Sequence, residues 1–519
     1  MPKPSRRVDY DYRDSESILR YAEKLIRHTL REAVPGIEDS KHGKGGLGQL
    51  VETEYFGIDS NNEPVPDFEE ARLELKTTPM KRISKKGLVA KERLVLNLIN
   101  YKTLLDSGFE GSFMEKDSRM LLMFYLYEKG KNRLDYTFLK CKIIEFTDSD
   151  LRIMHEDWNK ISDMVRNGRA EDISCGMTMY LEAAPKGQGH GKDLTEQPFS
   201  PVKAQRRAFA LKASFVTFLF NHWGETRLED SLGDWSRERT FEQEVIARFE
   251  GFYEMTVDEI SELLDIDGSE GKSRYAFLVR RMLKVTGDSI DELTKAGVIV
   301  KTVRLKKDGV PKESMSFRAF KYTDVASQEW EESDFYEDLT KRFLFIVFQE
   351  TDAGLVFKKA LFWNMPKEDL EEAERVWKEA KERIIAGDYR HLPKTDDSPI
   401  VHVRPHGQNK EDTFPTPQGG EETKKCFWLR NTYIAKVISG QNKIRRGSRN
   451  PPETYSNLAL SNPIESRRSS ISSRPSVNCS KSSFSMASSM TFSLWLRRSC
   501  MASSKDTILS PSSNSVSRK

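Results

Sequence analysis

The sequence has few cysteines and no long hydrophobic run. Its cysteines are five in number and far apart, which argues against a disulfide framework or a zinc site: Cys141, Cys175, Cys426, Cys479 and Cys500. No apolar stretch reaches the roughly eighteen residues that a membrane span needs. The N-terminal segment also lacks the apolar core of a signal peptide. These absences predict a cytoplasmic protein with reduced thiols.

The net charge is small as well, at +3 from 83 basic and 80 acidic residues. The distribution is uneven, because 13 of the basic and 3 of the acidic residues follow residue 440. The tail therefore carries +10 and residues 1–440 carry −7. A net-acidic body argues against nonspecific coating of nucleic acid, but it permits local basic surfaces.

Residues 441–519 contain 24 serines and no sustained hydrophobic periodicity. Such a segment cannot bury a core, so we predict a disordered C-terminal tail. Two interpretations stay open at this point. The tail is either a basic arm that binds DNA or a non-native extension, read in an abnormal frame, after a domain that ends near Ile438.

Hydrophobic periodicity predicts a mixed α/β domain over about the first 225 residues. Helices are predicted at 16–34, near Leu47 and at 148–168. Strands are predicted at 71–78, 93–100, 119–128, 134–146 and 177–184, and residues 212–223 fit either a helix or a strand.

The second half repeats the order of motifs in the first half. The matched pairs are Leu50-Val51 with Leu278-Val279, Lys76-Thr77 with Lys301-Thr302, Arg119 with Arg342, Trp158 with Trp377, Pro185 with Pro405, and Leu211-Lys212 with Leu429-Arg430. We therefore predict a tandem duplication, with one domain at 1–225, a second at 226–440 and the tail at 441–519.

The sharpest chemical signal is Asp67, Glu74 and Lys76, spaced D-x6-E-x-K. In a strand, Glu74 and Lys76 share one face, and Asp67 on the preceding arm can converge with Glu74 on a hard cation. Mg²⁺ held there would acidify a bound water, and Lys76 would orient or deprotonate that water. Alone the pattern is weak, because Glu74 and Lys76 also fit a salt bridge on a solvated strand.

The surrounding motifs make the pattern specific. They are LVE at 50–52, LELKT at 73–77, Lys116 before SRMLLMF, EDW at 156–158 and YLEAAPK at 180–186. Together they resemble the MutH-type endonucleases, which comprise the mismatch-repair nicking enzyme and the GATC-specific type II restriction enzymes. The resemblance implies restriction-endonuclease-like domains with a mixed sheet flanked by helices, Mg²⁺ dependence and cleavage of double-stranded DNA at GATC.

The resemblance also implies roles for individual residues. Asp67 and Glu74 would hold the metal, and Lys76 would assist the attacking water. Glu52 would support the metal or its water shell, with Glu54 as a competitor for that role. Lys116 matches a second catalytic lysine.

DNA contacts are predicted in both halves. Lys186 matches a DNA-contacting lysine, and His190 on the same glycine-rich loop is a candidate contact to a phosphate or a base edge. Arg404 and Arg430 in the second half are suited to phosphates.

The second copy lacks most of the chemical residues. Arg280 replaces Glu52, Ile299 replaces Glu74 and Leu339 replaces Lys116, while Lys301 keeps the lysine of the core motif. Glu292 alone cannot rebuild a hard-cation site. We predict an inactive second domain, and the larger GATC restriction enzymes that the chain resembles carry such a domain to bind DNA and regulate cutting.

These observations favour a bacterial type II restriction endonuclease. A palindrome must be cut on both strands, so a monomer is expected to pair as a dimer on DNA. The resemblance further implies a cognate methyltransferase in the same system. A mismatch-repair nicking enzyme and a nonenzymatic DNA-binding protein are the alternatives.

Overall fold

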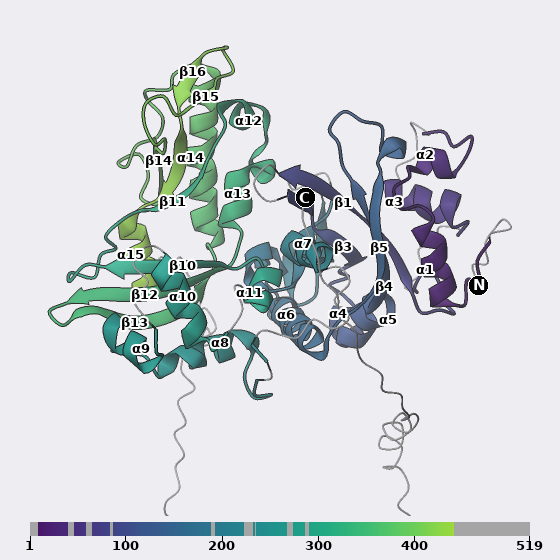
Figure 1. Ribbon diagram of the computed structural model, residues 1–519, viewed down its shortest axis with the longest axis horizontal. Coiled ribbons are helices and arrows are strands. Elements are labelled where there is room, and N and C mark those ends of the chain that lie inside the picture. Colours follow the sequence, from purple (N-terminus) through teal and green to yellow (C-terminus); the bar gives the residue numbers. More distant parts are fainter. Residues whose placement is uncertain are drawn as a thin grey trace, which may run out of the picture. The chain divides into compact units, whose positions relative to one another are not determined.

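The computed structural model describes residues 9–39, 46–58, 65–83, 87–187, 193–222, 232–233, 235–266, 273–285 and 290–440 (Figure 1). These residues belong to one compact unit. The predicted disordered tail and His190 lie outside the described residues. Within the described residues, no helix is long and apolar enough to cross a membrane.

The first repeat is built on a four-stranded mixed sheet with strand order β2-β1-β4-β5. Its strands are β1 (Glu74–Ile83), β2 (Gly87–Ala90), β4 (Arg119–Leu126) and β5 (Phe138–Glu145). β1 runs parallel to β4, whereas β2 and β5 are antiparallel to their neighbours. Every residue from Met120 to Phe124 is fully buried, because this strand is covered on both faces.

A second, three-stranded sheet completes the first repeat. Its order is β3 (Leu94–Leu98), β9 (Arg207–Leu211) and β6 (Leu181–Pro185). Between β6 and β9 in the chain, β7 (Leu194–Gln197) and β8 (Ser200–Gln205) form a hairpin. The buried carboxylate of Asp157 accepts hydrogen bonds from the backbone amides of Met179, Tyr180 and Leu181 at 2.6–3.0 Å. This side chain of the EDW motif therefore fixes where β6 begins.

The helices of the first repeat are mostly short, with one long exception. They are α1 (Ser15–Glu23), α2 (Leu30–Ala33), α3 (Leu47–Leu50), η1 (Val51–Tyr55), α4 (Leu104–Phe109), η2 (Glu110–Met114), α5 (Glu115–Asp117), η3 (Arg133–Asp135), α6 (Asp148–Arg166), η4 (Ala170–Asp172), η5 (Cys175–Met177) and α7 (Ala213–Asn221). α6 begins at Asp148, as the helix predicted for 148–168 does, and the Thr147 side chain caps it by accepting a hydrogen bond from the Asp150 amide. Of the segment 212–223, for which a helix or a strand was predicted, Ala213–Asn221 form the helix α7.

The single helix predicted for 16–34 is wrong. α1 ends at Glu23, and Arg27 in the following turn has a φ of 70°, which breaks the helix. Thr29 and Glu32 then form a capping box that starts α2. The apolar spacing across both pieces is nearly continuous, so periodicity alone did not reveal the break.

The second repeat keeps the topology of the first, except that its main sheet has three strands and, among the described residues, no counterpart of β2 (Figure 1). β10 (Ile299–Leu305) runs parallel to β12 (Phe343–Thr351), and β13 (Gly354–Trp363) is antiparallel to β12. A second sheet has the order β11 (Met315–Ala319), β17 (Lys425–Leu429) and β14 (Val401–Pro405), and β15 (Thr413–Pro415) pairs with β16 (Glu421–Thr423). The helices are α8 (Phe241–Glu250), α9 (Val257–Leu263), α10 (Ser273–Met282), α11 (Asp291–Lys295), α12 (Tyr322–Ser327), η6 (Trp330–Glu332), α13 (Asp334–Leu339), α14 (Lys367–Ile385) and α15 (Asn431–Ser439).

Strand register confirms the predicted duplication. Glu74 lies opposite Met120, one residue after Arg119, and Ile299 lies opposite Phe343, one residue after Arg342. The long helices α6 and α14 each have 19 residues, and the last helices α7 and α15 each have nine. The chain is therefore a tandem pair of restriction-endonuclease-like folds.

Each repeat has a hydrophobic cluster of its own, and a further cluster, from Met80 to Ala360, contains residues of both and is their shared core. A buried ion pair crosses it: Lys295 Nζ on α11 lies 2.9 Å from Asp150 Oδ1 on α6, with side chains 1% and 6% exposed. Lys295 also faces the rings of Phe215 and Phe218. The core and this pair predict that the repeats unfold together.

Lys295→Met should lower the free energy of unfolding by about 3–5 kcal/mol, because it takes the counter-charge away from a buried carboxylate. Urea unfolding followed by circular dichroism measures the change. Lys307→Met is the control, since its pair with Asp352 is exposed and should be worth less than about 1 kcal/mol. Equal losses in the two variants would contradict the structural importance of the buried pair.

Candidate active site

The parallel pairing of β1 with β4 assembles the predicted site. Glu74 opens β1 and lies opposite Met120 of β4. The segment just before β4 ends with Lys116 and Asp117 on α5, so this segment arrives beside Glu74 and Lys76. The register therefore brings together two sequence segments that are about 40 residues apart in the chain.

Asp67 and Glu74 lie on the two arms of a tight turn closed by a bridge between Phe68 and Leu73. The backbone amide of Asp67 donates to Glu74 Oε2 at 3.1 Å, and the amide of Leu75 donates to Asp67 Oδ2 at 2.9 Å. These reciprocal contacts hold both carboxylates at the start of β1, as the spacing D-x6-E predicts.

Two ammonium groups face the Glu74 carboxylate, which is 2% exposed. Lys76 Nζ donates a hydrogen bond to Glu74 Oε1, and Lys116 Nζ lies 3.7 Å from the same oxygen. The structure thus brings the predicted lysines together around one predicted metal ligand.

Glu52 on η1 belongs to the same cluster. Burial, together with the charges of Asp67 and Glu74, raises the pKa of Glu52 to about 7 despite the opposing effect of Lys76 and Lys116. The groups that act on Glu52 are thus the other four predicted site residues, which favours Glu52 over Glu54 for the supporting role.

Burial and neighbouring charge also perturb the other groups. The pKa of Asp67 is raised to about 6 by burial and by Glu74. Burial works to lower the pKa of Lys76, but Asp117 and Glu74 outweigh it and the net shift is upward. An upward shift keeps the Lys76 ammonium protonated, and an ammonium has no lone pair with which to accept a proton.

Asp117 is the site residue that sequence reasoning missed. Its side chain is fully buried, and burial raises its pKa to about 7. The sequence signal was its position, next to Lys116 and directly before a continuously apolar strand. Only the three-dimensional structure shows that this carboxylate points to Lys76, at 3.8 Å.

The donor set fits a hard divalent cation. Among the described residues, no three Asp, Glu, His or Cys side chains form a ready-made metal centre. Two carboxylates with water and phosphate oxygens nevertheless suffice for Mg²⁺. Four buried or half-buried carboxylates face two ammonium groups here. Burial, and after it the charges of the neighbouring carboxylates, raise the pKa values of Glu52 and Asp67, and a cation would relieve this excess of negative charge.

The equivalent position in the second repeat has lost this chemistry. Ile299 takes the place of Glu74 in the same register, and Lys301 remains. Glu292 is fully buried, and its Oε1 accepts a hydrogen bond from the amide of Leu232 at 2.9 Å. The carboxylate that could have stood in for Asp67 therefore has a structural contact.

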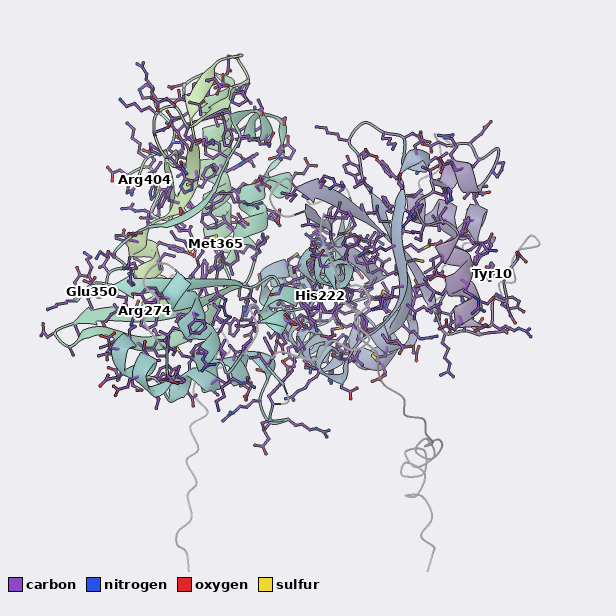
Figure 2. All side chains as sticks on the ribbon, in the orientation of Figure 1. Tyr10, His222, Arg274, Glu350, Met365 and Arg404 are labelled. Carbon is purple, nitrogen blue, oxygen red and sulfur yellow. The ribbon has the colours of Figure 1, made fainter. Side chains whose placement is uncertain are left out.

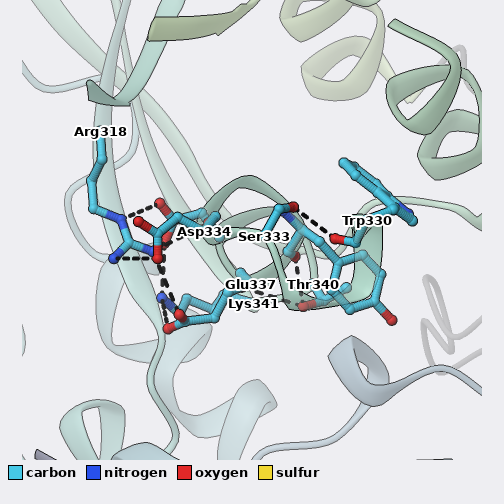
Figure 3. A network of polar contacts seen from close by, with 9 residues as sticks. Arg318, Trp330, Ser333, Asp334, Glu337, Thr340 and Lys341 are labelled. Atoms are coloured by element: carbon cyan, nitrogen blue, oxygen red, sulfur yellow. Dashed lines mark hydrogen bonds and ion pairs between the residues drawn. The ribbon is translucent and has the colours of Figure 1, made fainter. Parts of the chain in front are cut away.

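Ion pairs tie down the segment that corresponds to α5 (Figure 3). Arg318 on β11 contacts Asp338 of α13 at 2.9 Å, and Lys341 lies 2.8 Å from Asp338 and 3.0 Å from Glu337. Leu339, at the position of Lys116, is fully buried in the second repeat's core. This network stabilises α13 and leaves no equivalent of the lysine pair.

The predicted DNA contacts fall in different environments. Lys186 follows β6 and is half-buried, with its amide bonded to the Arg206 carbonyl. Arg404 is exposed on β14 (Figure 2), and its guanidinium donates to Thr395 Oγ1 at 3.2 Å. Arg430 donates instead to the carbonyls of Thr395 and Ser398 at 2.8 and 3.0 Å. Arg404 is therefore better placed than Arg430 to reach a phosphate.

Comparison with known proteins places both repeats in one family. The family model described as DNA mismatch repair enzyme MutH matches residues 56–157 and 283–374. The first segment contains β1 and β4, and the second contains β10 and β12. One matched segment thus lies in each repeat.

Individual relatives differ in how much of the chain they match. The type II restriction enzyme Sau3AI of Staphylococcus aureus is 30% identical over 487 residues, which cover 82% of this chain and 99% of that enzyme. The DNA mismatch repair protein MutH of Escherichia coli (strain SMS-3-5 / SECEC) is 25% identical and covers 39% of this chain and 90% of its own length. MutH of Shewanella sp. (strain ANA-3) is 28% identical, with coverages of 36% and 83%.

The raised pKa of Glu52 predicts a pH-dependent stability of the metal-free protein. A carboxyl group whose pKa rises on folding stabilises the fold fully below its unfolded value of 4.5, and this stabilisation is lost as the pH rises through about 7. Thermal unfolding from pH 4.5 to pH 8 should lose roughly 2–3 kcal/mol of stability through this group. Glu52→Gln should make the free energy of unfolding fall less steeply with pH. The same fall in this variant as in the unchanged chain would contradict the burial of Glu52 beside Asp67 and Glu74.

Proposed function

Because this chain belongs to the MutH family of site-specific deoxyribonucleases, we propose that it is a type II restriction endonuclease that cuts double-stranded DNA at GATC. The observation that carries the proposal is the match to a type II restriction enzyme along 99% of that enzyme's length, across both repeats. The MutH proteins match only 36–39% of this chain. The duplicated fold thus favours restriction over mismatch-repair nicking.

The site supports hydrolysis of a phosphodiester. Asp67 and Glu74 would hold Mg²⁺, with Glu52 beside them, and the ion would polarise the phosphate and acidify a bound water. Lys76, kept protonated by its acidic neighbours, offsets the negative charge that develops on the phosphate. Lys116 adds a second positive charge, 3.7 Å from Glu74 Oε1. The cleaved strand would carry a 5′-phosphate.

The second repeat acts as a DNA-binding and regulatory domain in this proposal. It keeps the scaffold of the first repeat but has Ile299 and Leu339 where the chemistry needs Glu74 and Lys116. Its domain would span residues 226–440 and the catalytic domain residues 1–225. One active site per chain cuts one strand, so two chains pair on a site, and a cognate methyltransferase protects the host DNA.

Single substitutions in the first repeat should stop cleavage without stopping DNA binding. Asp67→Ala and Glu74→Ala should remove detectable cutting, and Lys76→Ala should slow it by about 10²–10⁴-fold because charge stabilisation is lost. Single-turnover cleavage of a GATC duplex with Mg²⁺ measures the rate, and fluorescence anisotropy with Ca²⁺ measures binding.

Lys301→Ala is the matched control, since Lys301 has the register of Lys76 in the second repeat. It should leave the single-turnover rate within about twofold of the unchanged chain, because distant, independent sites act separately. Cleavage retained by Glu74→Ala would exclude the assigned site. Mapping the ends of a digested plasmid tests GATC itself.

Regulation by the second repeat predicts faster cutting of DNA with two sites. A plasmid with two GATC sites should be cut several-fold faster per site than a one-site plasmid, because the inactive domain is occupied in cis at high effective concentration. Equal rates would remove the regulatory role. Nicking confined to one strand of hemimethylated DNA would instead support the mismatch-repair alternative.

A further inference from the structure

The carboxylate of Asp117 makes no hydrogen bond, although Asp67, Glu74 and Lys76 beside it are joined by hydrogen bonds. Asp117 ends α5, its side chain is fully buried, and neither carboxylate oxygen has a hydrogen-bond partner. A buried carboxylate in this condition costs stability. Lys76 and Lys116 both act on this carboxylate, and Lys76 acts more strongly. Lys76 Nζ lies 3.8 Å from Asp117 Oδ1, which is too far for a hydrogen bond and close enough for a small movement to make one.

Glu74 differs from Asp117, because both oxygens of its carboxylate already accept hydrogen bonds. Lys76 donates to Oε1, Lys116 lies near the same oxygen, and the amide of Asp67 donates to Oε2. A metal ion bound at Oε1 would compete with Lys76 for this oxygen. The displaced ammonium then needs another acceptor, since an unpaired charge in a buried site is costly.

We propose that Asp117 is a positioning residue that receives Lys76 when Glu74 binds the metal. The ammonium exchanges its hydrogen bond to Glu74 for one to Asp117, keeps its charge and stays beside the reacting phosphate. The inference rests on the proposed function, in which Glu74 is a metal ligand. Asp117 itself contacts neither the metal nor the DNA.

The second repeat supports this role as an internal comparison. The residue two positions before Arg342, as Asp117 is before Arg119, is Thr340. Its hydroxyl donates to the Tyr336 carbonyl at 2.9 Å, an ordinary contact within a helix turn. Lys301 persists there, but the glutamate and the acceptor are both absent. The acceptor is thus present only where the lysine has a metal ligand to release.

Metal binding, measured apart from cleavage, tests the exchange. Isothermal titration calorimetry of the full-length, metal-free chain with Mg²⁺ gives the binding affinity. Four proteins are compared: the unchanged chain, Asp117→Asn, Lys76→Met and the variant that carries both substitutions. Asp117→Asn should weaken Mg²⁺ binding by about tenfold when Lys76 is present and by less than about twofold when it is methionine. Asp117→Asn could instead lower the Mg²⁺ affinity equally with lysine or methionine at position 76, which would indicate a simple effect of charge. It could also leave the affinity unchanged. Either result would overturn the proposal.

Two further variants control for charge and folding. Asp106→Asn removes the same charge from an exposed position on α4 and should not change the affinity. Asp117→Glu keeps a charged carboxylate acceptor, which Asp117→Asn does not, and should bind Mg²⁺ to within about threefold of the unchanged chain, so a failure of Asp117→Asn to fold leaves the test intact. If Glu74→Gln binds Mg²⁺ as the unchanged chain does, the proposed metal site fails. If Glu74→Gln loses binding but residues 76 and 117 show no coupling, only the exchange fails.

Discussion

The candidate active site depends on the parallel register between β1 and β4. Glu74 lies opposite Met120, so the residues that lead into β4 end beside the residues that open β1. Neither segment carries enough charge or burial alone to build a site. The pairing brings Lys116 and Asp117 to Glu74 and Lys76, and the apolar run at Met120–Phe124 makes the pairing stable because it is buried on both faces.

The same register is kept in the second repeat, which shows that the scaffold and the chemistry are separable. Ile299 and Phe343 pair as Glu74 and Met120 do, although Ile299 cannot bind a cation. Polar residues of the second repeat have structural contacts instead: Glu292 binds the Leu232 amide, and Arg318 and Lys341 hold α13 through Asp338. The shared core and the buried pair of Asp150 with Lys295 give this repeat a stabilising role as well.

Much of the fold could be predicted because it follows from local patterns. The start of α6 at Asp148 and the apolar run at β4 follow from local patterns in the sequence, and the predicted duplication follows from the order of the repeated motifs. The helix predicted for 16–34 was wrong because α1 ends at Glu23 and a capping box at Thr29 starts a new helix, although the spacing of apolar residues continues across the break. Asp117 could not be assigned because its burial and its distance to Lys76 depend on strand register, which sequence spacing does not contain. The roles of Lys186, Arg404 and Arg430 stay predictions, although the contacts of Arg430 with two carbonyls favour a structural role for it.

The balance of charge links the geometry of the site to its chemistry. Glu52, Asp67, Glu74 and Asp117 outnumber Lys76 and Lys116 by two charges when all are ionised, and burial makes that excess costly. Burial and this excess raise the carboxyl pKa values, so protons can neutralise the charge, and one divalent cation would do the same. In the proposed function, the cation would leave the carboxylates ionised and the lysines protonated. A phosphate would then meet positive groups that the fold already holds in position, so little reorganisation would be needed during the reaction.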